Sequence, residues 1–127
     1  MQLSSDSSYP SDICVLLRAY GEHRWLASQV LPVLVQVESG DEICDEELGA
    51  ALAYLEVLWL DACRHAAHTE AALEVLLAED PRTRGELHRQ ARSYSTAVRS
   101  LRSELAARVR DATEYHGPRI THLHAAF

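Results

Sequence analysis

The feature that most constrains the fold is a seven-residue repeat in the middle of the chain. Between residues 48 and 76, mostly apolar side chains recur in alternating steps of four and three for about four heptads, the spacing of a helix that packs along another long helix. A helix over residues 45–79 would be about 50 Å long. The repeat therefore predicts an elongated helical bundle. Its members are Leu48, Leu52, Leu55, Trp59, Ala62, Ala66, Thr69, Leu73 and Leu76.

A second long helix is predicted directly after the first. Asp80 can cap a helix and Pro81 fits its first position, and a narrow apolar face then continues with the same spacing to Tyr115. We expect the sequence from His116 to Pro118 to end this helix, because proline cannot continue the backbone hydrogen bonding. The connection between the two helices is very short, so they should form an antiparallel hairpin.

An N-terminal helix precedes the hairpin and should be kinked. Its apolar positions recur at helical spacing from residue 13 to residue 37, but Pro32 interrupts them and predicts a kink between Ser28 and Leu31. The predicted fold is all-α: a long antiparallel hairpin plus a kinked N-terminal helix, in a three- to four-helix bundle that dimerisation would complete. We expect a disordered leader over 1–11, the bundle domain over 12–116 and a tail over 117–127, in which Ile120, Leu123 and Phe127 have the spacing of a short docking helix.

Composition excludes several classes of protein. No apolar run approaches the roughly 18 residues of a membrane span, and the leader lacks the basic region of a secretory signal. The three cysteines have no CxxC spacing, which favours reduced thiols. The absence of lysine and asparagine is typical of a GC-rich genome. We therefore expect a cytoplasmic, bacterial protein that does not enter the membrane.

Charge is distributed unevenly along the chain. The net charge of −7 combines 12 acids and one arginine in residues 36–80 with eight arginines and two glutamates in residues 82–110. Several of these arginines lie opposite the apolar face of the second long helix and form a candidate charged docking face. Nucleic acid is an unlikely partner for it, because the chain is acidic overall and no aromatic residue interleaves with the arginines. The candidate residues are Arg89, Arg92, Arg99 and Arg110.

The helix over residues 45–79 also carries a second apolar face, opposite its heptad repeat. Small residues there permit the close approach of another helix. One alternative is that the N-terminal helix or the tail covers this face, and the other is that a partner protein or a second copy does. Trp25, next to Arg24 on the N-terminal helix, is a further candidate interface anchor. The candidate interface residues are Trp25, Ala53, Val57, Leu60, Ala71 and Val75.

One group of side chains has the chemistry of metal ligands. Asp61, His65 and His68 share one arc of a helix, and His23 on the N-terminal helix would add a donor if the two helices pack in register. The alternative is a polar surface stripe. Neither a metalloprotease motif nor a glycine-rich phosphate loop is present, so we assign no catalytic residue, expect no cofactor and do not favour an enzyme.

The sequence thus favours a non-catalytic helical adaptor or accessory subunit that acts through helix-mediated association with a protein partner or with itself, as a homodimer. The alternative is a bundle that binds a metal or small ligand through Asp61, His65 and His68. A third hypothesis is a nucleic-acid-binding subunit that uses the arginine stripe.

Overall fold

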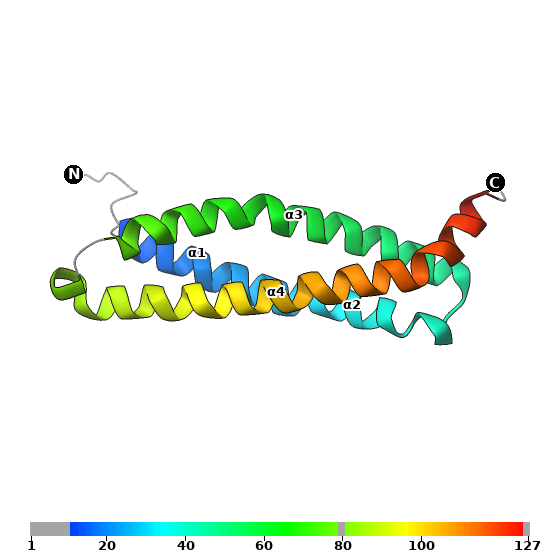
Figure 1. Ribbon diagram of the computed structural model, residues 1–127, viewed down its shortest axis with the longest axis horizontal. Coiled ribbons are helices and arrows are strands. Elements are labelled where there is room, and N and C mark those ends of the chain that lie inside the picture. The colour runs from blue at the N-terminus through cyan, green and yellow to red at the C-terminus, as the bar shows by residue number, and fades with distance from the viewer. Residues whose placement is uncertain (1–10, 79–80, 126–127) are drawn as a thin grey trace.

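The protein is an elongated helical bundle. The computed structural model describes residues 11–78 and 81–125, and this part of the chain contains helices and turns without any strand. The elements in order are α1 (Ser11–Trp25), a π-helical turn (Leu26–Val30), α2 (Leu31–Glu38), a 3-10 turn (Gly40–Glu42), α3 (Asp45–Leu77) and α4 (Pro81–Ala125). α1 and α2 follow one another along the bundle, α3 returns beside them, and α4 runs back beside α3 (Figure 1). The all-α prediction, with a long hairpin and a kinked N-terminal helix, is confirmed.

The predicted kink takes the form of a π-helical turn. The backbone N–H of Leu31 donates to the carbonyl of Leu26, five residues earlier, and Pro32 stands in the first turn of α2. The wider turn accommodates the proline, which has no N–H to donate and would clash with the preceding turn of a regular helix. Leu26 and Val30 are both buried, so the turn keeps the apolar side of the helix directed at the core.

The heptad repeat of α3 faces the core. Nearly all of its members are buried, including Thr69, whose hydroxyl donates to the carbonyl of His65 over 3.4 Å. Trp59 is the exception, since it is only partly buried while the neighbouring Leu58 lies inside. The heptad repeat therefore predicts the buried side of α3 correctly, except that Leu58 takes the buried position expected for Trp59.

The prediction that α4 ends at His116–Pro118 is wrong. The helix continues to Ala125 with Pro118 inside it, although Gly85, at a positive φ of 44° that favours glycine, interrupts its first turns. Beyond Pro118 the helix is held by contacts with the core and with the segment between α2 and α3. Ile120 is buried in the core, and Arg119 donates to the carbonyls of Gly40 at 2.7 Å and Ile43 at 2.6 Å.

A close approach at Gly40 completes this end of the bundle. A Cβ atom there would lie 2.7 Å from Cδ1 of Leu48 and 2.8 Å from Cε1 of the buried His116, so any other residue would require these side chains to shift. The first ten residues of the predicted leader lie outside the described residues, as do the side chains of Leu123 and Phe127, whereas Ser11 already belongs to α1.

The core consists of two apolar clusters along the bundle axis. The larger one joins the π-helical turn and α2 to the first half of α3 and the second half of α4, and the smaller one joins α1 to the opposite halves. Between them, Glu22, Glu70 and Arg102 form a polar layer. Within residues 11–78 and 81–125, no helix is sufficiently long and apolar to cross a membrane.

Candidate functional site

A groove between α1 and α3 brings together several polar side chains. It has a volume of about 600 Å³. Residues one turn apart on α1 form one wall, and residues of the same arc on α3 form the other. The lining residues are Arg18, Glu22 and Trp25 of α1 and Asp61, Ala62, His65, His68 and Thr69 of α3.

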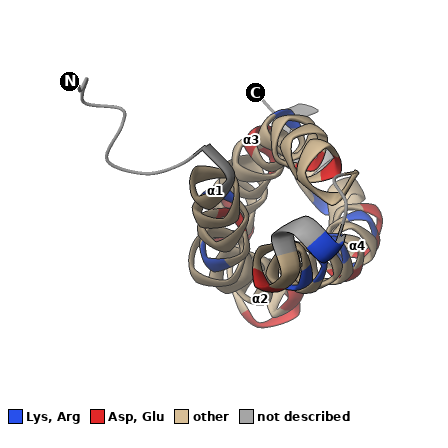
Figure 2. Cartoon of the chain, turned by 90° about the vertical axis from the view of Figure 1, so that its left-hand side faces the viewer, with Lys and Arg blue, Asp and Glu red and all other residues tan. Residues whose placement is uncertain are grey.

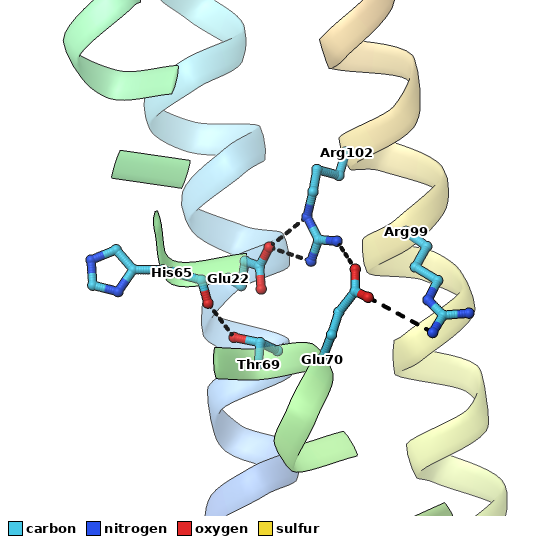
Figure 3. A network of polar contacts seen from close by, with 6 residues as sticks. All are labelled: Glu22, His65, Thr69, Glu70, Arg99 and Arg102. Atoms are coloured by element: carbon cyan, nitrogen blue, oxygen red, sulfur yellow. Dashed lines mark hydrogen bonds and ion pairs between the residues drawn. The ribbon is translucent and has the colours of Figure 1, made fainter. Parts of the chain in front are cut away.

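Glu22 lines this groove and belongs to the polar layer. Arg102 of α4 donates from Nε (3.0 Å) and Nη2 (2.6 Å) to Oε2 of Glu22, and from Nη1 to Oε2 of Glu70 (Figure 3). Arg99 extends the network, with Nη2 3.8 Å from Oε1 of Glu70. The Glu22 and Arg102 side chains are only 7% and 15% exposed. Charges this far from water require such pairing.

One oxygen of this network is left without a partner. Oε1 of Glu22 is buried and accepts no hydrogen bond, while Oε2 of the same carboxylate accepts both donors from Arg102. Thr69, which lines the same groove, directs its hydroxyl to the carbonyl of His65 instead (Figure 3). Most buried polar atoms in proteins have a partner, so an unpartnered carboxylate oxygen beside a groove indicates a place for a donor.

The predicted arc of Asp61, His65 and His68 does line the groove, but it does not form a metal-binding group. Among the described residues, no three His, Cys, Asp or Glu side chains are arranged to hold a metal ion. Asp61 pairs with Arg64 at 3.6 Å, and the His65 ring is turned away from Glu22 (Figure 3). His23, predicted as a further donor, does not line the groove, and its neighbour Glu22 does.

The second apolar face of α3 is exposed. Val57, Leu60 and Val75 are 58%, 59% and 69% exposed, and Ala53 and Ala71 are exposed beside them. Of the two alternatives for this face, coverage by the N-terminal helix is therefore not observed, nor is coverage by the described part of the tail.

Trp25 does not belong to this exposed face. It is partly buried, packs against the larger apolar cluster and lines the groove between α1 and α3. Its place next to Arg24 suggested an interface anchor, but the helix turns its indole toward α3.

The arginine stripe of α4 is exposed but largely paired with acids. Arg89 pairs with Glu86, Arg99 approaches Glu70 at 3.8 Å, and Arg110 approaches Asp111 at 3.5 Å. Within the described residues, Arg92 makes no ion pair. Basic and acidic residues are interspersed around α4 when the bundle is viewed along its length (Figure 2). This interspersion reduces the positive potential that phosphate binding requires.

A separate ion pair joins α2 to α4. Arg108 donates from Nε to Oε2 of Glu38 at 2.8 Å and from Nη2 to Oε1 at 2.5 Å. These hydrogen bonds hold the pKa of Glu38 below its ordinary value, against a smaller opposing effect of burial, and they raise the pKa of Arg108. The arrangement is a two-pronged clamp between helices.

Sequence reasoning missed the polar layer, although a signal for it was present. Glu22 follows Leu16 and Ala19 and precedes Leu26 at core spacing, and Arg102 stands between the buried Val98 and Leu105. Charged residues at core positions of two helices are expected to pair with each other.

Comparison with known proteins provides no functional assignment: no family model, curated protein or solved structure matches the chain.

Proposed function

We propose that the protein is a non-catalytic helical adaptor that associates with a second copy of itself through the outward face of α3. The observation that carries this proposal is the exposed apolar stripe of Ala53, Val57, Leu60, Ala71 and Val75. Arg64 interrupts this stripe at its centre, and exposed apolar residues on both sides of a charged one are typical of protein interfaces.

The stripe is complementary to itself when two copies of α3 pack antiparallel. In such a pair with a two-fold axis at Arg64, residues equally far from Arg64 lie at the same height. Val57 then lies beside Ala71 of the other copy, and Ala53 beside Val75, so these layers combine a large and a small side chain, while Leu60 lies at the height of His68. This alternation supports close helix packing.

Charge near the axis also fits a second copy. Arg64 and Asp61 form an exposed ion pair within one chain, with a separation of 3.6 Å. Across a two-fold axis at Arg64, the same two side chains can exchange partners between copies. Because the pair is symmetric, neither charge loses its counterion when the faces meet.

The test is the mass of the purified protein in solution, measured by sedimentation. We expect a dimer for the natural chain and a monomer for the double variant Leu60→Glu/Ala71→Glu, because four carboxylates would face each other in the apolar interface. Both residues are exposed in the single chain. The double variant should therefore unfold at nearly the same temperature as the Leu17→Glu control described below, when the two are compared at concentrations where both are monomeric.

The matched control is Leu17→Glu, which places a charge at a 51% exposed apolar position on α1 and should leave the dimer intact. A monomeric natural chain at micromolar concentration overturns the proposal, as does a double variant that remains dimeric. A position-specific check uses Cys63, which is exposed on α3. In a chain with Cys14→Ser and Cys44→Ser, a short bis-maleimide should link two copies through Cys63.

A further inference from the structure

The groove between α1 and α3 is lined by Glu22, whose buried Oε1 has no partner, and by the exposed Arg18, which makes no ion pair within the described residues. We propose that this groove binds a free amino acid with an apolar side chain. Glu22 would bind its ammonium group, and Arg18 would bind its carboxylate.

Glu22 provides the site for the ammonium group. Its side chain is 7% exposed, its Oε2 is saturated by Arg102, and its Oε1 has no partner. A buried carboxylate oxygen is stabilised by a charged N–H donor more than by a neutral one. Arg102 already offsets part of the negative charge, which favours a single ammonium over a divalent metal ion, in agreement with the lack of a three-ligand group among the described residues.

Arg18 provides the site for the carboxylate. It lies one turn before Glu22 on the same side of α1, lines the groove, and makes no ion pair within the described residues. Arg18 and Glu22 do not pair with each other, because Arg102 draws the Glu22 carboxylate inward. Side chains at this spacing have Cβ atoms about 6 Å apart, which suits two groups that bracket one amino acid. A guanidinium binds a carboxylate through two parallel hydrogen bonds.

The remaining lining suits an apolar side chain. Trp25 and Ala62 contribute apolar surface, and Asp61 is held by Arg64 at 3.6 Å and does not compete for the ammonium group. The volume of about 600 Å³ lies in the range of small-ligand sites. Oε1 is shielded from solvent, so lining side chains must move aside on binding. Arg18, His65 and His68 are exposed and have the freedom to do so.

Three probes with a common phenyl body separate the contributions of the two charges. Calorimetric titration of the full chain should show binding of phenylalanine, binding of phenethylamine that is weaker by about tenfold or more, and no binding of 3-phenylpropionate. The ammonium group is required in this scheme, and the carboxylate adds affinity. No binding of phenylalanine overturns the proposal, and so does binding of 3-phenylpropionate that equals it.

Variants then assign each charge to its residue. Arg18→Gln should abolish the preference for phenylalanine over phenethylamine without weakening phenethylamine itself, and because Arg18 is exposed this variant should fold normally. Glu22→Gln should weaken both ligands by about tenfold or more. Arg24→Gln, an exposed arginine of α1 outside the groove, is the matched control and should change neither affinity. An unchanged preference in Arg18→Gln overturns the assignment. Since the readout is ligand affinity, failure here leaves the mass test of the dimer unaffected.

Discussion

The two apolar clusters of the bundle are built from the same helices, yet they differ in size. The larger cluster contains 14 buried residues and the smaller one six, and of the largest fully buried side chains only Val98 belongs to the smaller cluster among the described residues. Both ends bury polar groups, His88 and Ser95 at the smaller end and His116 at the larger one. Apolar burial is the main source of stability, so the end of the bundle where α3 ends and α4 begins should be the less stable one.

The position of the groove follows from this difference. Glu22 and Arg102 lie where the two clusters meet, and Glu22 also lines the groove. A binding site at the boundary of a more stable and a less stable region can adjust its lining without disturbing the larger cluster. The difference in stability between the two ends of the bundle therefore bears directly on its candidate site.

The largest expected effect comes from breaking the polar layer. Arg102→Met should lower the free energy of unfolding by about 3–5 kcal/mol, because the buried carboxylate of Glu22 would lose its counterion. Urea denaturation measures the loss. Arg92→Met, at an exposed position of the same helix that makes no ion pair with the part of the chain the structure describes, should change stability by less than about 0.5 kcal/mol. Similar values for the two variants would show that the ion pair between Arg102 and Glu22 does not stabilise the fold.

Cavity formation tests the two clusters directly. Leu55→Ala in the larger cluster should cost about 3–4 kcal/mol, and Leu73→Ala in the smaller one about 2 kcal/mol, because fewer and smaller neighbours allow the site to collapse. The two leucines are 1% and 2% exposed, so the comparison does not depend on their burial. If Leu73→Ala costs as much as Leu55→Ala, the supposed difference between the ends is wrong.

A smaller effect should be confined to the less stable end. Nε2 of His88 lies 3.0 Å from the carbonyl of Leu77, the last residue of α3, and joins the two long helices beside their connection. His88→Phe should cost about 1 kcal/mol for the lost hydrogen bond. Amide hydrogen exchange should quicken around residues 73–91 and stay unchanged around residues 48–58. His65→Phe, at an exposed position, is the control; faster exchange at both ends would contradict a local effect.

The smallest effect concerns the clamp at the larger end. The pKa of Glu38 is lowered from 4.5 by its hydrogen bonds with Arg108, so its contribution to stability is complete above pH 4.5 and is lost as the pH falls through the lowered value. The pair is about one-third exposed, which limits the contribution to less than about 1 kcal/mol. Unfolding of the natural chain and of Glu38→Gln should differ at pH 7 and converge in acid. If the difference in unfolding free energy between the two proteins stays the same from pH 7 into acid, the ion pair between Glu38 and Arg108 is not the source of that difference.

Periodic features of the sequence were sufficient for the fold. The heptads of α3 and the proline in the N-terminal helix determine which sides are buried and where the helix is distorted, because both are local rules. The end of α4 was mispredicted, since the burial of Ile120 and the contacts of Arg119 are tertiary interactions that outweigh the local effect of Pro118.

The candidate site was only partly predictable. The α3 wall with Asp61, His65 and His68 followed from helical spacing, but the opposite wall depends on how α1 is rotated against α3. That rotation brings Glu22 into the groove in place of His23. Single-helix periodicity places residues on a face and does not specify which face of a neighbouring helix meets it.

The π-helical turn gives this chain an unusual sensitivity to length. Ala27, Ser28 and Gln29 are exposed, so their side chains can be exchanged with little effect on packing. Removal of any one of them would leave a regular helical turn and would keep the direction of the α1 faces nearly unchanged, because a π-helical turn fits one extra residue into about one turn of helix. The ring of Pro32 would then clash with the carbonyl four residues before it, a clash that the wider turn avoids. The segment is therefore tolerant of substitution and intolerant of deletion: the number of residues in it, and not their identity, makes room for the proline.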